Sequence, residues 1–132
     1  MRGKKKYFVF NEPALNTFDE VLAKEREEIA NYKIVDIREV EIFPLKEILD
    51  MYLPKDQTID FINIDVEGLD FEVIQSNDWN KYRPQVVIVE IIPAQCIEDL
   101  LEHETTKYLK AFGYSIFAKT FNSVIFSLGA SQ

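Results

Sequence analysis

The stretch from residue 59 to residue 72 constrains the fold most, because an apolar strand pattern runs directly into acidic residues and a glycine. It reads Ile-Asp-Phe-Ile-Asn-Ile-Asp-Val-Glu-Gly-Leu-Asp-Phe-Glu. The alternation predicts a strand that is apolar on both faces at its start and polar on one face at its end. Such a gradient is typical of a central parallel strand that is covered on both sides over most of its length. Gly68 ends the strand pattern, and a short helix is expected after it.

The acidic end of this strand is a candidate ligand site. Open parallel sheets bind ligands just beyond the carboxyl ends of their strands, which is where Asp65 and Glu67 lie. A carboxylate there is costly to bury unless it is paired, hydrogen-bonded or near solvent. Asp65 therefore either caps the next helix or holds a loop, or else it faces a ligand. The spacing favours the ligand slightly.

A second acidic residue ends another strand pattern. Residues 85–92 form the most apolar run of the chain, and their length and β-branched content predict a buried strand. Glu90 interrupts this run near its end. A single carboxylate in such a run is either paired with a basic group or exposed at the carboxyl edge of the sheet.

The remaining patterns predict alternating strands and helices. Thr17 and Glu20 match a capping box, with Thr17 as the N-cap of a helix. Pro44 suits the start of another helix, where its missing N–H is harmless. Trp79 is interpreted as a packing anchor rather than a stacking platform. The other expected elements are strands at 7–10 and 33–43, a helix at 98–112, and an antiparallel strand pair at 114–118 and 124–128. The apolar stripes are expected at Phe18, Val21, Leu22 and Ile29 on the first helix and at Leu45, Ile48, Leu49 and Tyr52 on the second.

Composition excludes several classes of function. A chain of 132 residues is expected to form one domain, and the net charge of −8 argues against a general nucleic-acid binder. No apolar run approaches the ~20 residues that cross a bilayer, so a cytoplasmic protein without membrane contact is expected. Cys96 is the only cysteine and His103 the only histidine, so neither an internal disulfide nor a Cys/His zinc site is predicted. His103 is interpreted as a solvated surface residue.

The ordered set of these segments resembles the FkbM family of S-adenosylmethionine-dependent methyltransferases. The resemblance covers nearly the whole chain. It is carried by residues 59–74 around Asp-Val-Glu-Gly, by Asn16-Thr17-Phe18, by Arg83-Pro84 with residues 86–90, by Gly113-Tyr114, and by residues 122–126. It implies an α/β fold with a mixed, mostly parallel sheet of Rossmann-methyltransferase type, ending in an antiparallel strand pair.

One part of the family pattern is missing from this sequence. The family carries a Gly-rich loop after its first strand, where backbone N–H groups approach the cofactor, and an acidic residue after its second strand. The four glycines of this chain, Gly3, Gly68, Gly113 and Gly129, form no such unit. Residues 1–132 are therefore expected to be a single partial domain, truncated at its N-terminal side.

The resemblance also implies roles for the acidic residues. Asp65 and Glu90 would be catalytic, and Asp65, Glu67 and Gly68 would border S-adenosylmethionine. The acceptor would be an oxygen on a small molecule or a sugar. Three interpretations remain open: a methyltransferase half-domain, a non-catalytic remnant or interaction module that could form a homo-oligomer, and an unrelated metal-dependent hydrolase using Asp65, Glu67, Asp70 and Glu90.

Overall fold

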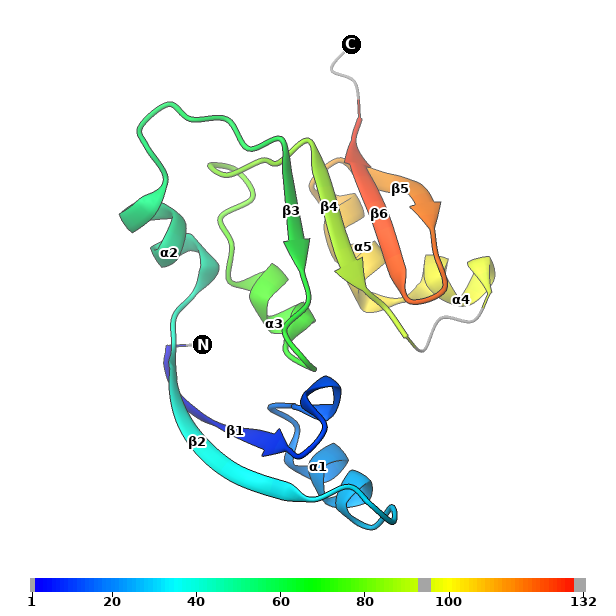
Figure 1. Cartoon of the computed structure of the whole chain (residues 1–132). Coiled ribbons are helices and arrows are strands. Elements are labelled where there is room, and N and C mark those ends of the chain that lie inside the picture. The colour runs from blue at the N-terminus through cyan, green and yellow to red at the C-terminus, as the bar shows by residue number, and fades with distance from the viewer. Residues whose placement is uncertain (1, 93–95, 130–132) are drawn as a thin grey trace.

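The computed structural model describes residues 2–92 and 96–129, which form a two-stranded and a four-stranded sheet with short helices (Figure 1). The elements in chain order are β1 (Gly3–Phe10), the 3₁₀ helix η1 (Pro13–Leu15), α1 (Glu20–Glu27), β2 (Ile34–Ile42), α2 (Leu45–Tyr52), β3 (Phe61–Ile64), α3 (Asp70–Gln75), β4 (Val86–Glu90), α4 (Ile97–Glu102), α5 (Glu104–Ala111), β5 (Tyr114–Lys119) and β6 (Ser123–Leu128).

The four-stranded sheet has the order β3-β4-β6-β5. Only β3 and β4 are parallel, whereas β4 pairs antiparallel with β6, and β6 with β5. The predicted terminal antiparallel pair is confirmed, but the prediction of a mostly parallel sheet is wrong. The predicted central position of β3 is also wrong, because the strand lies at the sheet edge. The C-terminal hairpin of β5 and β6 lies on the far side of β4. In the described sheet, β3 therefore pairs with β4 alone.

Helices cover one face of this sheet and leave the other more open. The covered face buries side chains from all four strands against Ile74 of α3, Leu100 of α4 and Leu109 of α5. On the opposite face, Phe61 is 62% exposed and Ile88 is half-buried. Figure 1 shows α5 behind the sheet, with no described helix in front of β4 and β6. The apolar start of β3 therefore reflects a surface that the described residues leave largely uncovered.

Trp79 is confirmed as a packing anchor. Its side chain is 1% exposed and lies in the main core. The indole Nε1 donates a hydrogen bond to the Ile74 carbonyl at 2.7 Å. Tyr114 packs edge-on against the indole at a ring-centroid distance of 5.4 Å. The residue therefore joins the turn before β4 to the buried face of the sheet.

The predicted first strand and helix cap differ from the structure. β1 begins at Gly3 and pairs antiparallel with β2 in a separate sheet. Thr17 is not an N-cap: it forms a β-bridge with Phe8 and is 1% exposed. The N-cap of α1 is Asp19, whose carboxylate accepts the backbone N–H groups of Val21 and Leu22. Asp19 is as suitable a cap as Thr17, and the bridge to β1 decides between them.

Two helices bury less apolar surface than their patterns predict. α1 ends before Ile29 and has Ala23 as its buried residue, while Val21 is 67% exposed. No residue of α2 is buried, and Tyr52 is 76% exposed. A helical stripe indicates which side is apolar, but not whether another element covers it.

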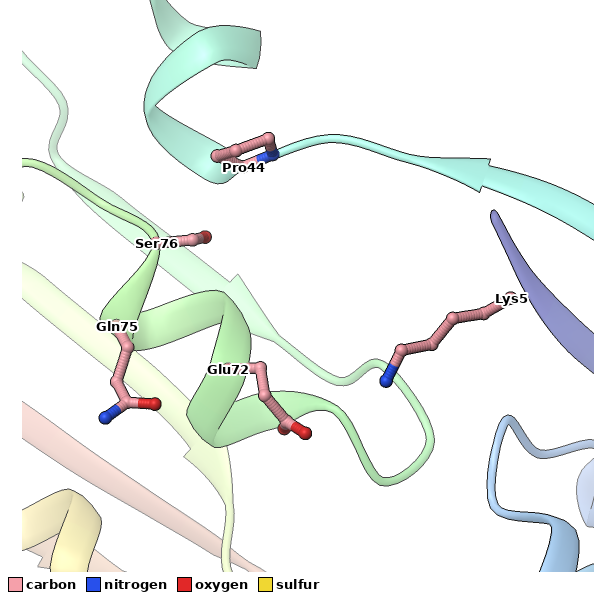
Figure 2. A pocket seen from close by; sticks show the side chains of 5 residues that line it. All are labelled: Lys5, Pro44, Glu72, Gln75 and Ser76. Carbon is pink, nitrogen blue, oxygen red and sulfur yellow. The ribbon is translucent and has the colours of Figure 1, made fainter. Parts of the chain in front are cut away.

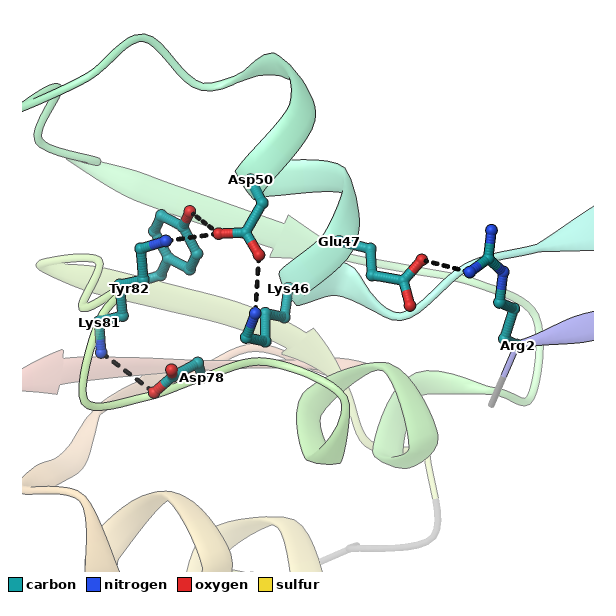
Figure 3. A network of polar contacts seen from close by, with 7 residues as sticks. All are labelled: Arg2, Lys46, Glu47, Asp50, Asp78, Lys81 and Tyr82. Atoms are coloured by element: carbon teal, nitrogen blue, oxygen red, sulfur yellow. Dashed lines mark hydrogen bonds and ion pairs between the residues drawn. The ribbon is translucent and has the colours of Figure 1, made fainter.

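Polar contacts rather than apolar packing hold α2 near the four-stranded sheet (Figure 3). The Asp50 carboxylate accepts hydrogen bonds from Lys46, Lys81 and the Tyr82 hydroxyl. At the start of the helix, the Leu45 N–H donates to the Ser76 hydroxyl oxygen at 2.9 Å. α2 is thus tied to both ends of the segment that joins α3 to β4.

The predicted helix at 98–112 is two helices, α4 and α5. His103 lies between them with an extended backbone, at φ −64° and ψ 139°. The apolar spacing continues through the break, which hides it from pattern analysis. Pro93, which is expected to close the apolar strand of residues 85–92, lies outside the described residues.

Candidate functional site

Asp65 and Glu90 lie at the same end of the four-stranded sheet. Ile64 and Val89 are the last register pair between the parallel strands β3 and β4. Asp65 and Glu90 are the next residues along each chain segment. The two predicted site residues are therefore brought together at the carboxyl edge, because parallel strands end on the same side.

The loop after β3 has an unusual backbone. Glu67 has φ 53° and Gly68 has φ 100°, so two consecutive residues adopt the left-handed region. Glycine enters this region without steric cost, whereas another residue pays about 1–2 kcal/mol. The turn reverses the chain between β3 and α3 and leaves Glu67 half-buried on the loop.

Asp70 supports this loop from the first turn of α3. Its carboxylate accepts the Val66 N–H at 3.3 Å. Burial raises the pKa of Asp70, while its bonds to backbone N–H groups oppose that shift. Asp70 is thus a loop-holding residue, which is the role that sequence analysis left open for Asp65.

The acidic groups of the site act on one another. Burial raises the pKa of Glu90 above its usual value, and the charges of Asp65, Asp70 and Glu67 add to that rise. Burial also raises the pKa of Glu67, with a further contribution from Asp65 and an opposing one from Arg26. The four carboxylates form one like-charged cluster, in which Glu67, Asp70 and Glu90 have a pKa above the ordinary value.

A cavity of about 530 Å³ opens beside Glu90. Its lining includes Gly68 from the loop, Asp70, Glu72 and Gln75 from α3, and His103 before α5. Asp65 and Glu67, two of the predicted site residues, are not part of this lining. The cavity therefore offers carboxylates and polar groups that suit a ligand rich in hydroxyls.

His103 is a site residue that sequence analysis missed. It is half-buried, lines the cavity with Glu90, and caps α5 by accepting the Thr105 N–H on Nδ1 at 3.3 Å. A nitrogen that accepts this bond has no proton, so a neutral ring carries its proton on Nε2. The expectation of a solvated surface residue is met only in part, because His103 is half-buried and lines the cavity. The break between α4 and α5 gives it this position.

A second cavity of about 400 Å³ lies on the other side of α3. Figure 2 shows Lys5 reaching from β1 toward α3, with Glu72 pointing to the same space and Pro44 across it. Glu72 and Gln75 line both cavities. The two cavities therefore flank a single short helix.

Within residues 2–92 and 96–129, no group of three or more His, Cys, Asp or Glu side chains is arranged to hold a metal ion. This leaves the metal-dependent hydrolase without a ligand set in that part of the chain. None of the helices that the structure describes is long and apolar enough to cross a membrane.

The mixed sheet and the carboxylates at the ends of its parallel strands place the chain among α/β proteins with a candidate site at that edge. The family model of the methyltransferase FkbM domain matches residues 3–116. The chain therefore belongs to the FkbM methyltransferase domain family. Comparison with curated proteins and with solved structures gave no match.

The described residues do not form a cradle for S-adenosylmethionine, the cofactor that the family implies. Gly68 is the glycine at the carboxyl end of a parallel strand, and a Cβ placed on it would meet the Cβ of Asp19 at 3.8 Å. Gly68 is thus a single glycine with one side-chain neighbour at ordinary contact distance, and no second glycine adjoins it. A cofactor cradle instead needs successive bare backbone N–H groups.

Proposed function

We propose that this chain provides the acceptor side of an S-adenosylmethionine-dependent methyltransferase that acts on an oxygen of a small molecule or sugar. Family membership supports the reaction class. One observation supports binding of the methyl acceptor by this chain. Asp65 and Glu90 lie at the same carboxyl edge of the sheet, and Glu90 and His103 line a cavity there. Asp65, Glu67 and Gly68 would border the cofactor only where a Gly-rich loop completes the site.

The roles follow from the chemistry of the side chains. Glu90 can take the proton that an acceptor hydroxyl loses, because a carboxylate with a raised pKa is a stronger base than an ordinary one. Asp65 can accept a hydrogen bond from the same or a neighbouring hydroxyl and orient it, and positioning of this kind supplies much of the rate. We propose Asp65 as the residue most needed for activity.

The test combines binding and turnover, with the Gly-rich half of an FkbM-family domain supplied as a second chain because this chain forms no cofactor cradle. Calorimetry with S-adenosylmethionine reports cofactor binding, and transfer of its radiolabelled methyl group to a panel of monosaccharides and hydroxylated small molecules reports activity. Asp65→Asn and Glu90→Gln should each lower transfer by about 10²-fold or more. Glu41→Gln on the exposed side of β2 is the matched control and should leave transfer unchanged. The proposal would be contradicted if calorimetry shows that S-adenosylmethionine binds but no acceptor receives the radiolabelled methyl group. Full activity of both site variants would contradict it as well.

A second function, an interaction module, is favoured by one specific observation. The edge strand β3 and the more open sheet face present Phe61 to solvent. An edge strand next to apolar surface promotes association. If calorimetry and methyl transfer are both silent, sedimentation velocity should reveal a concentration-dependent homo-oligomer that Phe61→Glu abolishes. A monomer at all concentrations would leave this second function without support.

A further inference from the structure

The left-handed Glu67 is held in place by a segment fifty positions earlier in the chain. The Thr17 hydroxyl donates to the Glu67 carbonyl at 3.2 Å. The Phe18 N–H donates to the same oxygen at 3.4 Å. Two donors on one carbonyl fix the orientation of the peptide that links Glu67 to Gly68. This contact offsets the strain of a non-glycine residue at φ 53°.

The hydrogen bonds of Thr17 are fully determined. Its hydroxyl oxygen accepts the Asp19 N–H at 3.0 Å, so the hydroxyl proton is available for the Glu67 carbonyl, which can only accept. Its backbone N–H and C=O pair with Phe8 of β1 at 3.2 and 2.9 Å. Thr17 is thereby fastened to the two-stranded sheet on one side and to the site loop on the other.

Neighbouring contacts partly shield this connection from water. Thr17 is almost completely buried, and the rings of Tyr7 and Phe18 pack at a centroid distance of 4.7 Å. Bonds in such an environment are costly to break, because the freed carbonyl and N–H remain without partners. The two-stranded sheet thus serves as the support from which Thr17 reaches the loop.

From this arrangement we infer that Thr17 is a positioning residue of the candidate site. Through the Glu67 carbonyl, it fixes the loop that carries the Asp65 and Glu67 carboxylates beside Glu90. Asp70 holds the same loop from the opposite side through the Val66 N–H. The catalytic meaning of this role rests on the proposed function, whereas the positioning itself is independent of cofactor and acceptor.

Two substitutions distinguish a role of the Thr17 hydroxyl from a role of the side-chain volume. Valine has nearly the same shape as threonine but would leave the Glu67 carbonyl and the Asp19 N–H without the hydroxyl. Serine keeps the hydroxyl and loses only a methyl group. If positioning depends on the hydroxyl, Thr17→Val changes the loop and Thr17→Ser preserves it.

The readout is the titration of the Glu67 side chain, followed by carbon-13 NMR of its carboxyl group in the full chain. Burial and Asp65 raise the pKa of Glu67, and Arg26 opposes them, so this pKa reports where the loop stands. We expect Thr17→Val to move it by at least about 0.3 pH units toward the ordinary value of about 4.3. Thr17→Ser should titrate as the wild type does.

The matched control is Thr106→Val. Thr106 is also a buried threonine, but its hydroxyl has no hydrogen-bond partner among the described residues, so valine removes no bond there. The inference is overturned if folded Thr17→Val titrates like the wild type, if Thr17→Ser is altered as much as Thr17→Val, or if Thr106→Val produces an equal shift at Glu67.

A second measurement decides the case in which Thr17→Val does not fold. In the wild type, hydrogen exchange at the Phe18 and Asp19 amides should be slowed at least about 100-fold relative to an unstructured peptide. Exchange near the unstructured rate would overturn the inference. Neither measurement uses a cofactor, so a failure of the methyltransferase proposal would show in calorimetry and methyl transfer and leave these results unaffected.

Discussion

Asp65 follows Ile64 and Glu90 follows Val89, the last parallel pair of β3 and β4, so the two carboxylates stand next to each other at one end of the sheet. This proximity has an electrostatic cost. Both Glu90 and Glu67 have a raised pKa because of burial first and of neighbouring carboxylates second. The site is therefore held together against the repulsion of its own charges.

The first prediction concerns the pH dependence of that repulsion. A carboxyl whose pKa is raised in the folded protein binds protons more tightly there than in the unfolded chain, so its contribution to stability falls as pH rises through the raised value. Glu90→Gln removes this effect. The free energy of unfolding of the variant, relative to the wild type, should increase from pH 4 to pH 7.5. Urea denaturation at both pH values measures it, and a difference independent of pH would contradict it.

The second prediction concerns Asp50, whose pKa is shifted in the opposite direction from that of Glu90. Hydrogen bonds from Lys46, Lys81 and Tyr82 hold the pKa of Asp50 well below its usual range. Its stabilising effect is therefore present above the ordinary carboxyl pKa of about 3.9 and is lost as pH falls toward the lowered value. Asp50→Asn should accelerate amide hydrogen exchange in α2 at pH 7.

The salt dependence provides the check on this second prediction. The Asp50 contacts are partly exposed ion pairs, so salt should screen them. In 0.5 M salt the screening length is about 3–10 Å, and the difference in α2 exchange rate between Asp50→Asn and the wild type should become smaller. Equal exchange in α2 for both proteins at low salt would show that these contacts do not hold the helix.

The third prediction concerns the main core. Trp79→Phe removes part of a buried side chain and the hydrogen bond from the indole Nε1 to the Ile74 carbonyl. We expect a loss of about 2 kcal/mol in the free energy of unfolding, from the cavity and the lost indole hydrogen bond together. Urea denaturation followed by circular dichroism measures it. Phe121→Ala, at a side chain 93% exposed, should change stability by less than about 0.5 kcal/mol.

The fourth prediction concerns the site loop. Gly68→Ala places a side chain at φ 100°, where L-residues are strained even though the nearest atom is 3.8 Å from the new Cβ. The expected cost is about 1–2 kcal/mol of stability, measured by thermal denaturation. Gly129→Ala is the control, since its backbone is not left-handed and its nearest contact is an ordinary 3.5 Å. An equal loss of stability in Gly68→Ala and Gly129→Ala would contradict the claim that the backbone at Gly68 is strained for other residues.

Local patterns predicted the elements that depend on nearby residues. The strand and helix around Gly68, the buried run that ends at Glu90, the packing of Trp79 and the terminal strand pair all appear in the structure. Each follows from side-chain alternation, helical spacing or a turn residue. The family resemblance implied that Asp65 and Glu90 share one site, and the parallel pairing of β3 with β4 brings the carboxyl ends of both strands together.

Tertiary structure decided what those elements meet. Whether β3 is central or at an edge depends on whether another strand pairs with its second side, and no local pattern encodes that choice. Thr17 matches a capping box, yet β1 recruits it and the Glu67 carbonyl takes its hydroxyl. His103 reaches the cavity only because the helix breaks there. The sequence determined which residues are apolar, acidic or helix-forming. Long-range contacts alone selected their partners, since a hydrogen bond or a buried face needs a neighbour that is distant along the chain.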